Sequence, residues 1–275
     1  MRFPLKDVKV RQVSVVRRVA TPVYADNYWQ MNQHEFAMQA EGVADFYACD
    51  GREVEYAPAE GADTNSIELY MNGSVYGAVL HQRQILPFHG SSFLYNDTAV
   101  MICGDAGAGK SSLTASFCLN GAEFLTDDVT PVVFRDGMPY VRALSDRMKL
   151  WGDTLRQFER EGSMLDRIYP GTDKYFYPMS GSGGKTVKLG LILIIEIDDM
   201  GEVTTEEMSG PVKFAAIRGE IYRAEYLQGM PENEAVYFRN LVEIIRNVRV
   251  VRILRPSIVR IARLHEVAEE VLKQM

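Results

Sequence analysis

A short glycine-rich stretch, residues 104–111, has the residue types and spacing that could hold a phosphate group. It reads Gly-Asp-Ala-Gly-Ala-Gly-Lys-Ser and matches the phosphate-loop pattern G-x-x-x-x-G-K-S. Glycines let the backbone turn so that consecutive N–H groups face one anion, and a helix that begins here directs its positive end at that anion. Lys110 would add a mobile cation, and Ser111 would offer a hydroxyl to Mg²⁺. The expected phosphate contacts come from Gly104, Asp105, Ala106, Gly107, Ala108, Gly109, Lys110, Ser111 and Ser112.

The residues around this loop predict the elements that would position it. An apolar run at 99–103 indicates a buried strand, residues 112–119 have helical periodicity, and Asn120-Gly121 is a helix stop. A second short apolar run then ends in Asp127-Asp128. Nucleotide-bound Mg²⁺ needs further oxygen ligands, and an acidic residue at the end of a neighbouring strand would supply one. A glycine-rich turn that binds nothing is the alternative, but the order strand, loop, helix, acid favours a nucleotide.

Composition limits the other function classes. The chain has 275 residues, of which 47% are hydrophobic and 24% charged, as in an ordinary soluble globule. A net charge of −7 argues against general nucleic-acid binding, which needs a basic face. The three cysteines have no metal-ligand spacing, the N-terminus lacks a signal-peptide core, and the longest apolar run, 189–195, is too short to span a bilayer. We therefore expect a cytoplasmic protein that binds neither nucleic acid nor membrane.

The remaining chain predicts a small N-terminal mixed α+β segment at 1–65 and a main domain at 66–275. In the segment we expect a strand at 8–19 and a hairpin at 46–56. In the main domain, residues 66–71 resemble a strand, and 72–83 resemble a helix capped by Asn72. Further on we expect a hairpin at 129–142, helices at 144–158, 211–226, 234–246 and 258–273, a loop at 173–178, and a strand at 248–254.

Two later stretches imitate nucleotide motifs. Residues 180–186 resemble a second phosphate loop, but Met179 stands where the first glycine should be and a strand follows. We interpret this stretch as a loop that could cover the nucleotide. Residues 191–199 form an apolar run ending in acids, as in motor or ABC-type ATPases, where Asp198 would act on Mg²⁺ and water. Neither an LSGGQ-like signature nor an NKxD motif accompanies it, so a hairpin turn at 198–201 with a return strand at 202–205 is the simpler interpretation.

A histidine and an arginine cluster each leave two interpretations open. His89 lies fifteen residues before Gly104, and a lone histidine beside an apolar run is usually structural. Residues 239–263 contain seven arginines against one acid, Glu243. They indicate a solvated face, or alternatively contact with an acidic substrate or a neighbouring subunit.

Taken together, His89-Gly90, the loop and the run Asn-Gly-Ala-Glu-Phe-Leu-Thr-Asp-Asp at 120–128 resemble the HPr kinase family. Ala106 stands where that family usually has serine. Residues 80–83 and 146–151 more closely resemble the HPr-kinase-related branch, which includes kinases of lasso-peptide biosynthesis. The family's arginine–glycine signature for phosphorylase activity is not at the matching place, so the resemblance implies the kinase reaction. It implies an α/β fold with a P-loop nucleotide-binding core of the HPr kinase/PEP carboxykinase-like type.

The resemblance also implies roles for individual residues. Lys110 would bind the β and γ phosphates of ATP, Ser111 and Asp127 would hold Mg²⁺, Asp128 would take the acceptor's proton, and His89 would tune the aspartates. The acceptor would be a serine of a peptide or small protein, such as a ribosomal peptide precursor, and the chain could form a homo-oligomer. A kinase for a small-metabolite hydroxyl and a non-kinase ATPase or switch using Asp198 are the alternatives. Adjacent strand residues point to opposite faces, so both aspartates can serve only if the chain turns there.

Overall fold

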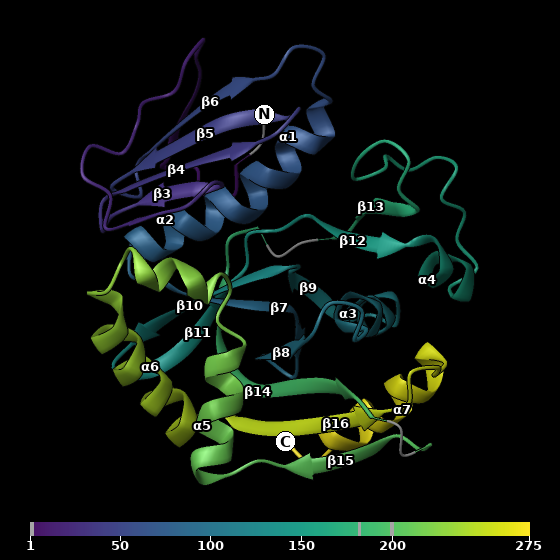
Figure 1. Ribbon diagram of the computed structural model, residues 1–275. Coiled ribbons are helices and arrows are strands. Elements are labelled where there is room, and N and C mark those ends of the chain that lie inside the picture. Colours follow the sequence, from purple (N-terminus) through teal and green to yellow (C-terminus); the bar gives the residue numbers. More distant parts are fainter. Residues whose placement is uncertain (1–2, 181–182, 199–200) are drawn as a thin grey trace. The chain divides into compact units, whose positions relative to one another are not determined.

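The computed structural model describes residues 3–180, 183–198 and 201–275, and it has a mixed α/β fold with several sheets (Figure 1). The chain forms two compact units. The first comprises residues 1–87, 167–172 and 222–239, and the second comprises residues 88–166, 173–221 and 240–275. The predicted boundary after residue 65 falls within α1 (Thr64–Tyr70) of the first unit. The assignment of residues 66–275 to one catalytic domain stays a prediction.

The first unit is built on a six-stranded sheet with the order β1-β6-β5-β4-β3-β2. β1 is parallel to β6, and the other neighbours are antiparallel. The predicted hairpin at 46–56 is confirmed, since β5 and β6 pair around Asp50 and Gly51, which both have positive φ as a tight hairpin turn requires. The strands are β1 (Lys9–Gln12), β2 (Tyr24–Ala25), β3 (Trp29–Met31), β4 (Glu35–Ala40), β5 (Ala44–Cys49) and β6 (Glu53–Pro58).

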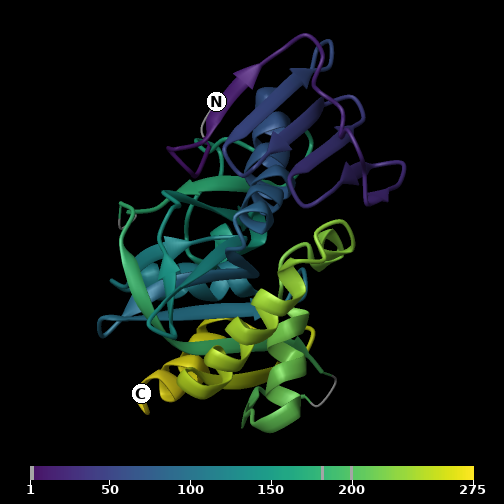
Figure 2. The same cartoon turned by 90° about the vertical axis from the view of Figure 1, so that its left-hand side faces the viewer.

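One face of this sheet is covered by a continuous helical stretch, α1, the π-helical η1 (Met71–Val75) and α2 (Tyr76–Gln82) (Figures 1 and 2). The strand predicted at 66–71 is therefore wrong. Ile67, Met71 and Val75 are buried and spaced four residues apart, which is a helical period. The predicted cap at Asn72 is also wrong, because Asp63 accepts the Ser66 N–H and caps the helix at a point well before Asn72.

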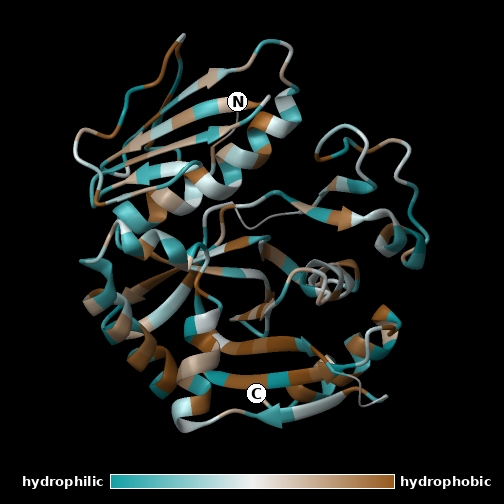
Figure 3. Cartoon of the chain, viewed as in Figure 1, coloured by the Kyte–Doolittle hydropathy of each residue, from teal (hydrophilic) through white to brown (hydrophobic). Residues whose placement is uncertain are grey.

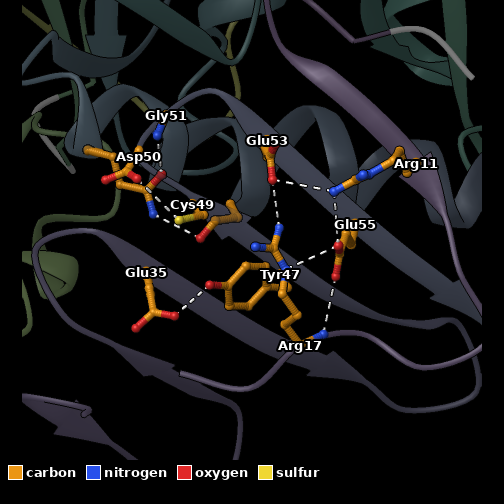
Figure 4. A network of polar contacts seen from close by, with 11 residues as sticks. Arg11, Arg17, Glu35, Tyr47, Cys49, Asp50, Gly51, Glu53 and Glu55 are labelled. Carbon is orange, nitrogen blue, oxygen red and sulfur yellow. Dashed lines mark hydrogen bonds and ion pairs between the residues drawn. The ribbon is translucent and has the colours of Figure 1, made fainter. Parts of the chain in front are cut away.

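The opposite face of the sheet carries a network of charged and aromatic side chains (Figure 4). Arg17 pairs with Glu53 and Glu55, and its guanidinium lies 4.5 Å from the centre of the Tyr47 ring. The strand predicted at 8–19 is consequently confirmed only for Lys9–Gln12, because the chain leaves the sheet edge to make these contacts.

The second unit is built on an eight-stranded sheet with the order β11-β10-β7-β8-β14-β16-β15, with β9 paired to β7. β8, β14 and β16 are mutually parallel, and β7 is antiparallel to β8 and β9. The strands are β7 (Leu86–Tyr95), β8 (Thr98–Gly104), β9 (Glu123–Thr126), β10 (Val129–Arg135), β11 (Met138–Arg142), β14 (Thr186–Ile197), β15 (Thr204–Glu207) and β16 (Arg249–Arg255).

Most of the predicted elements of this unit are confirmed. The strand at 99–103 is β8, and the helix after the glycine-rich loop is α3 (Lys110–Leu119), which ends at Asn120 before Gly121 at φ +105°. β10 and β11 form the predicted hairpin. The later helices and strand are α6 (Asn233–Asn247), β16 and α7 (Ile261–Leu272). The helix predicted at 211–226 is shorter, since α5 (Gly210–Gly219) is followed by a separate 3₁₀ turn, η2 (Ala224–Gln228).

Residues 144–178 differ from the prediction. The helix predicted at 144–158 is correct only for α4 (Gly152–Gln157), because the residues before it form β12 (Arg147–Trp151). The loop predicted at 173–178 is β13 (Lys174–Pro178), which pairs antiparallel with β12. The physical reason is a period of two: Met148 and Leu150 are buried in an apolar cluster, while their neighbours lie on the other face.

The predicted hairpin after β14 is also wrong. β15 pairs with β16, and β14 lies between its parallel neighbours β8 and β16. β14 is apolar along most of its length (Figure 3) and belongs to the core cluster with β8, α3 and α7. Residues 181–182 of the predicted covering loop and 199–200 of the predicted turn lie outside the described residues. None of the helices in the described ranges is both long and apolar enough to cross a bilayer.

Candidate functional site

The glycine-rich loop connects the end of β8 to the start of α3. Gly104, Gly107 and Gly109 all have positive φ, at +129°, +83° and +104°. At Gly104 a side chain is also excluded by space, because a Cβ would lie 2.2 Å from the Ile195 carbonyl oxygen of the neighbouring strand. The backbone of this loop is thus available only to glycine at its turning points.

The first turn of α3 presents unsatisfied N–H groups. Gly109 stands at the N-cap and offers no side-chain acceptor. Within the described part of the chain, the amides of Lys110, Ser111 and Ser112 have no acceptor. Free amides and the positive end of a helix together favour an anion at this point.

Arg255, the last residue of β16, holds the glycine-rich loop from outside. Its guanidinium is buried and donates to the Ala108 carbonyl at 2.8 Å and the Gly107 carbonyl at 2.9 Å, as well as to the carbonyls of Pro256 and Ser257. In a trans peptide the C=O and the following N–H point in opposite directions. With the Ala108 carbonyl turned to Arg255, the Gly109 N–H therefore points to the inner side of the loop.

Four other arginines of the predicted cluster have ordinary partners. Arg246, Arg249, Arg252 and Arg263 form ion pairs with glutamates, which agrees with the interpretation as a solvated face. Arg255 is the exception in this group, because it is buried and bonds only to carbonyls.

Lys110 is buried and folds back over the loop. Its Nζ donates to the Gly104 carbonyl at 2.7 Å and to the Asp105 carbonyl at 3.0 Å. The Gly104 N–H donates to the Glu220 carboxylate at 3.0 Å, and the His89 N–H donates to the Glu220 carbonyl at 2.8 Å. Burial raises the pKa of Glu220. Glu220 thus links the glycine-rich loop to β7, the strand that contains His89. No local sequence pattern predicts this connection.

The acid pair lies at the same edge of the sheet as the loop. β9 and β8 both run antiparallel to β7, so their C-terminal ends meet at one edge. A chain of buried hydroxyls fixes the position: Ser92 bonds Thr126, Thr126 bonds Thr130, and Thr130 donates to the Gly90 carbonyl next to His89. β9 ends before the pair, and Asp128 has a φ of +69°. The chain therefore turns where the sequence left the question open.

Asp127 faces the glycine-rich loop. The Ser111 hydroxyl donates to its Oδ1 at 2.8 Å, and the Lys149 N–H donates to its Oδ2 at 2.7 Å. Burial and the adjacent Asp128 charge raise the pKa of Asp127, against the influence of Lys149 and Ser111. Mg²⁺ bound with a nucleotide takes one or two protein oxygens and completes its shell with phosphate and water. The hydroxyl of Ser111 and the carboxylate of Asp127 fit that requirement.

Asp128 faces a lysine and a histidine. The Lys149 Nζ lies 2.7 Å from its Oδ2, and the His89 Nε2 lies 3.8 Å from its Oδ1. Burial alone would raise the pKa of Asp128, but the Lys149 ammonium outweighs it and holds that pKa well below its usual range. The carboxylate is therefore ionised at neutral pH. The structure brings His89, Lys110, Ser111, Asp127 and Asp128 to one edge of the sheet.

Lys149 and Lys174 are not among the predicted site residues, because the sequence predicts a helix at 144–158 and a loop at 173–178. The pairing of β12 with β13 brings both lysines to the acid pair. The alternation of apolar and polar residues at 147–151 predicts the strand β12, but it does not predict that β12 pairs with β13.

The competing acidic strand end, that of β14, has different surroundings. Glu196 pairs with Arg252, and the Asp198 N–H donates to the Arg255 carbonyl. The Ser111 hydroxyl donates to Asp127. Asp199 lies outside the described residues.

No protein-family model and no curated protein matches the chain. Among solved structures, the Hpr(Ser) kinase/phosphatase from Coxiella burnetii is similar, with a TM-score of 0.35 and 13% sequence identity over 69% of this chain and 92% of that one. A TM-score of this size is too low to transfer a function. The proposal below therefore depends on the residues of the site.

Proposed function

We propose that the chain is a Mg-ATP-dependent phosphotransferase that phosphorylates a hydroxyl group, that of a serine in a peptide or small protein. The observation that carries the proposal is the 2.8 Å bond from the Ser111 hydroxyl, on the first turn of α3, to Asp127, with the ionised Asp128 next in the chain. These residues would combine a phosphate loop, a pair of metal ligands and a base in one arrangement.

In this proposal the loop and the first turn of α3 bind the phosphates. The amides of residues 109–112 and the Lys110 ammonium would face the anion, after Lys110 exchanges its two carbonyl partners for phosphate oxygens. Ser111 and Asp127 would hold Mg²⁺, which when bound neutralises charge on the β and γ phosphates.

Asp128 would accept the proton of the acceptor hydroxyl. A carboxylate with a lowered pKa is a weak base, and phosphoryl transfer through a loose transition state needs a group that positions the nucleophile more than a strong base. Lys149 occupies Oδ2 of Asp128, so Oδ1, on the side of His89, is the oxygen proposed for the acceptor.

The serine acceptor and the ribosomal peptide class rest on the resemblance of residues 80–151 to HPr-kinase-related proteins. A cytoplasmic location and a homo-oligomer belong to the same proposal. A small-metabolite hydroxyl is the second candidate acceptor, since the residues proposed for transfer would serve either.

An ATPase or switch acting through Asp198 is less well supported. The phosphate-loop serine bonds Asp127, and the backbone N–H of Asp198 is engaged by the Arg255 carbonyl. Magnesium in such a site would need an acid beside Ser111, and Asp127 has that position.

The test is a transfer assay with γ-labelled ATP, Mg²⁺, a pool of serine peptides and a cytoplasmic extract, with Lys110→Ala as control. Label on a peptide or protein that disappears with the control variant supports the proposal and identifies the acceptor class. Label on a small molecule supports the metabolite alternative. Release of phosphate without any labelled acceptor, unchanged in Asp128→Asn and lost in Asp198→Ala, would overturn the kinase proposal in favour of an ATPase.

A further inference from the structure

The β12–β13 hairpin carries a lysine, Lys174, that forms no ion pair with an acid of the described residues. We propose that Lys174 binds the anionic oxygens of the phosphoryl group while it is transferred. This inference rests on the proposed function and adds a catalytic residue to it.

The register of the hairpin places Lys174 beside the acid pair. Trp151 is directly opposite Lys174, and Lys149 is opposite Phe176, so these four side chains share one face. The other face packs Met148, Leu150 and Tyr175 into an apolar cluster. Diagonal neighbours across such a pair lie roughly 7–8 Å apart. Lys174 is therefore the diagonal neighbour of Lys149, whose Nζ bonds Asp128.

The three lysines of this region differ in how their charges are balanced. Lys149 pairs with Asp128, and Lys110 bonds two carbonyls. Lys174 lies 5.2 Å from the centre of the Trp151 ring and has no ion-pair partner in the described residues. Burial and the nearby Lys149 charge lower the pKa of Lys174, while Asp127 and Asp128 act in the opposite sense. A partly buried cation held close to other cations is the electrostatic environment expected where an anion binds.

The transferred phosphoryl group is the anion that fits. In the transfer step the acceptor oxygen forms a bond to the γ phosphorus, the bond from that phosphorus to the bridging oxygen breaks with its electrons going to ADP, and the acceptor proton goes to Asp128. Charge spreads over the three equatorial oxygens during this step. Lys174 keeps its proton throughout and stabilises those oxygens, together with Lys110 and the metal.

The experiment compares Lys174→Met and Lys174→Arg with the wild type. Met keeps most of the apolar stem that packs on Trp151 and removes the charge, whereas Arg keeps the charge. The matched control is Lys188→Met, on the exposed face of β14. For each variant, kcat and KM are measured with the acceptor found in the transfer assay, ATP affinity is measured separately, and thermal unfolding checks the fold.

We expect Lys174→Met to lower kcat by about 100-fold, the effect of removing one preorganised electrostatic contact, with the ATP dissociation constant changed less than about threefold. Lys174→Arg should recover at least a tenth of the wild-type kcat, and Lys188→Met should match the wild type. An unchanged kcat in Lys174→Met, or a rise only in the acceptor KM, would overturn the inference, the latter because the cation would then bind the acceptor. Absence of transfer by the wild type would instead count against the proposed function.

Discussion

Two polar regions, one in each unit, each contain a histidine, but they differ in how completely their hydrogen-bonding and charged groups have partners. In the first unit, His81 is fully buried; its Nε2–H donates to the Tyr222 carbonyl at 2.9 Å, and its Nδ1 lies 3.1 Å from the Tyr237 hydroxyl. Asn233 donates to the His81 carbonyl. Burial lowers the pKa of His81 to about 4. Each group in this network has its partner within the unit.

In the second unit, the region around His89 and Asp128 contains hydrogen-bond donors that have no acceptor, and a charged group that has no ion pair, in the described residues. The amides at the start of α3 lack acceptors in the described residues, Lys174 lacks an ion pair there, and the His89 side chain is 35% exposed. A satisfied polar network stabilises a fold, whereas spare donors and unbalanced charge indicate a ligand. The difference favours a structural role for His81 and is consistent with the functional role proposed for the surroundings of His89.

The substitution with the largest expected effect tests the role proposed for Asp128 in the second unit. Asp128→Asn should lower phosphoryl transfer by about 10³-fold, because the amide cannot take the acceptor's proton. ATP binding, measured by calorimetry, should largely persist, since Asp128 is not among the residues proposed to bind ATP or the metal. An unchanged rate of phosphoryl transfer in Asp128→Asn would show that Asp128 is not the base.

Arg255→Met should weaken ATP binding by about 10- to 100-fold, because two loop carbonyls lose a charged donor worth roughly 1.5–3 kcal/mol and the loop amides lose their fixed direction. Added guanidinium should restore part of the affinity. Arg252→Met, three residues earlier on the same strand and ion-paired to Glu196, is the control. If both variants bind ATP like the wild type, Arg255 does not position the loop.

A third prediction concerns the contribution of the buried His81 network to the stability of the first unit. The folded pKa of His81, about 4, lies below the ordinary histidine value of 6.5, so the unfolded chain takes up the proton first as pH falls. Stability contributed by neutral His81 is present above pH 6.5 and is lost as pH falls toward 4. Between pH 6.5 and 5 the loss should be about 2 kcal/mol, at 1.36 kcal/mol per pH unit.

The measurement is urea unfolding followed by Trp29 fluorescence in a Trp151→Phe background, which reports on the first unit alone. His81→Gln should flatten the pH dependence in this window, and His89→Gln should leave it unchanged. A wild-type unfolding free energy that does not vary between pH 6.5 and 5 would contradict the assigned role of His81.

The smallest expected effect is that of Asp198→Ala. The backbone N–H of Asp198 donates to the Arg255 carbonyl, and the substitution keeps this hydrogen bond. Phosphoryl transfer and ATP binding should therefore each change by less than about twofold. If ATP turnover is lost in Asp198→Ala but unchanged in Asp128→Ala, the catalytic acid lies at the end of β14 and not at the end of β9.

Local pattern was sufficient for the strand, loop, helix and stop between residues 98 and 121, because propensity, capping and glycine conformations act over a few neighbouring residues. The acid pair at 127–128 could be recognised for the same reason. The π-helical turn at 71–75 and the β12–β13 hairpin could not, since tertiary packing of Met71, Met148 and Leu150 decided their form.

Only the tertiary structure decided which acidic strand end faces Ser111, and it alone brings Lys149, Lys174, Glu220 and Arg255 to the candidate site. Glu220 and Arg255 reach the loop from more than 100 residues away, and the order of strands in the sheet brings them there. Short-range patterns carry no information on that order, because it depends on which apolar faces pack together once the chain has folded.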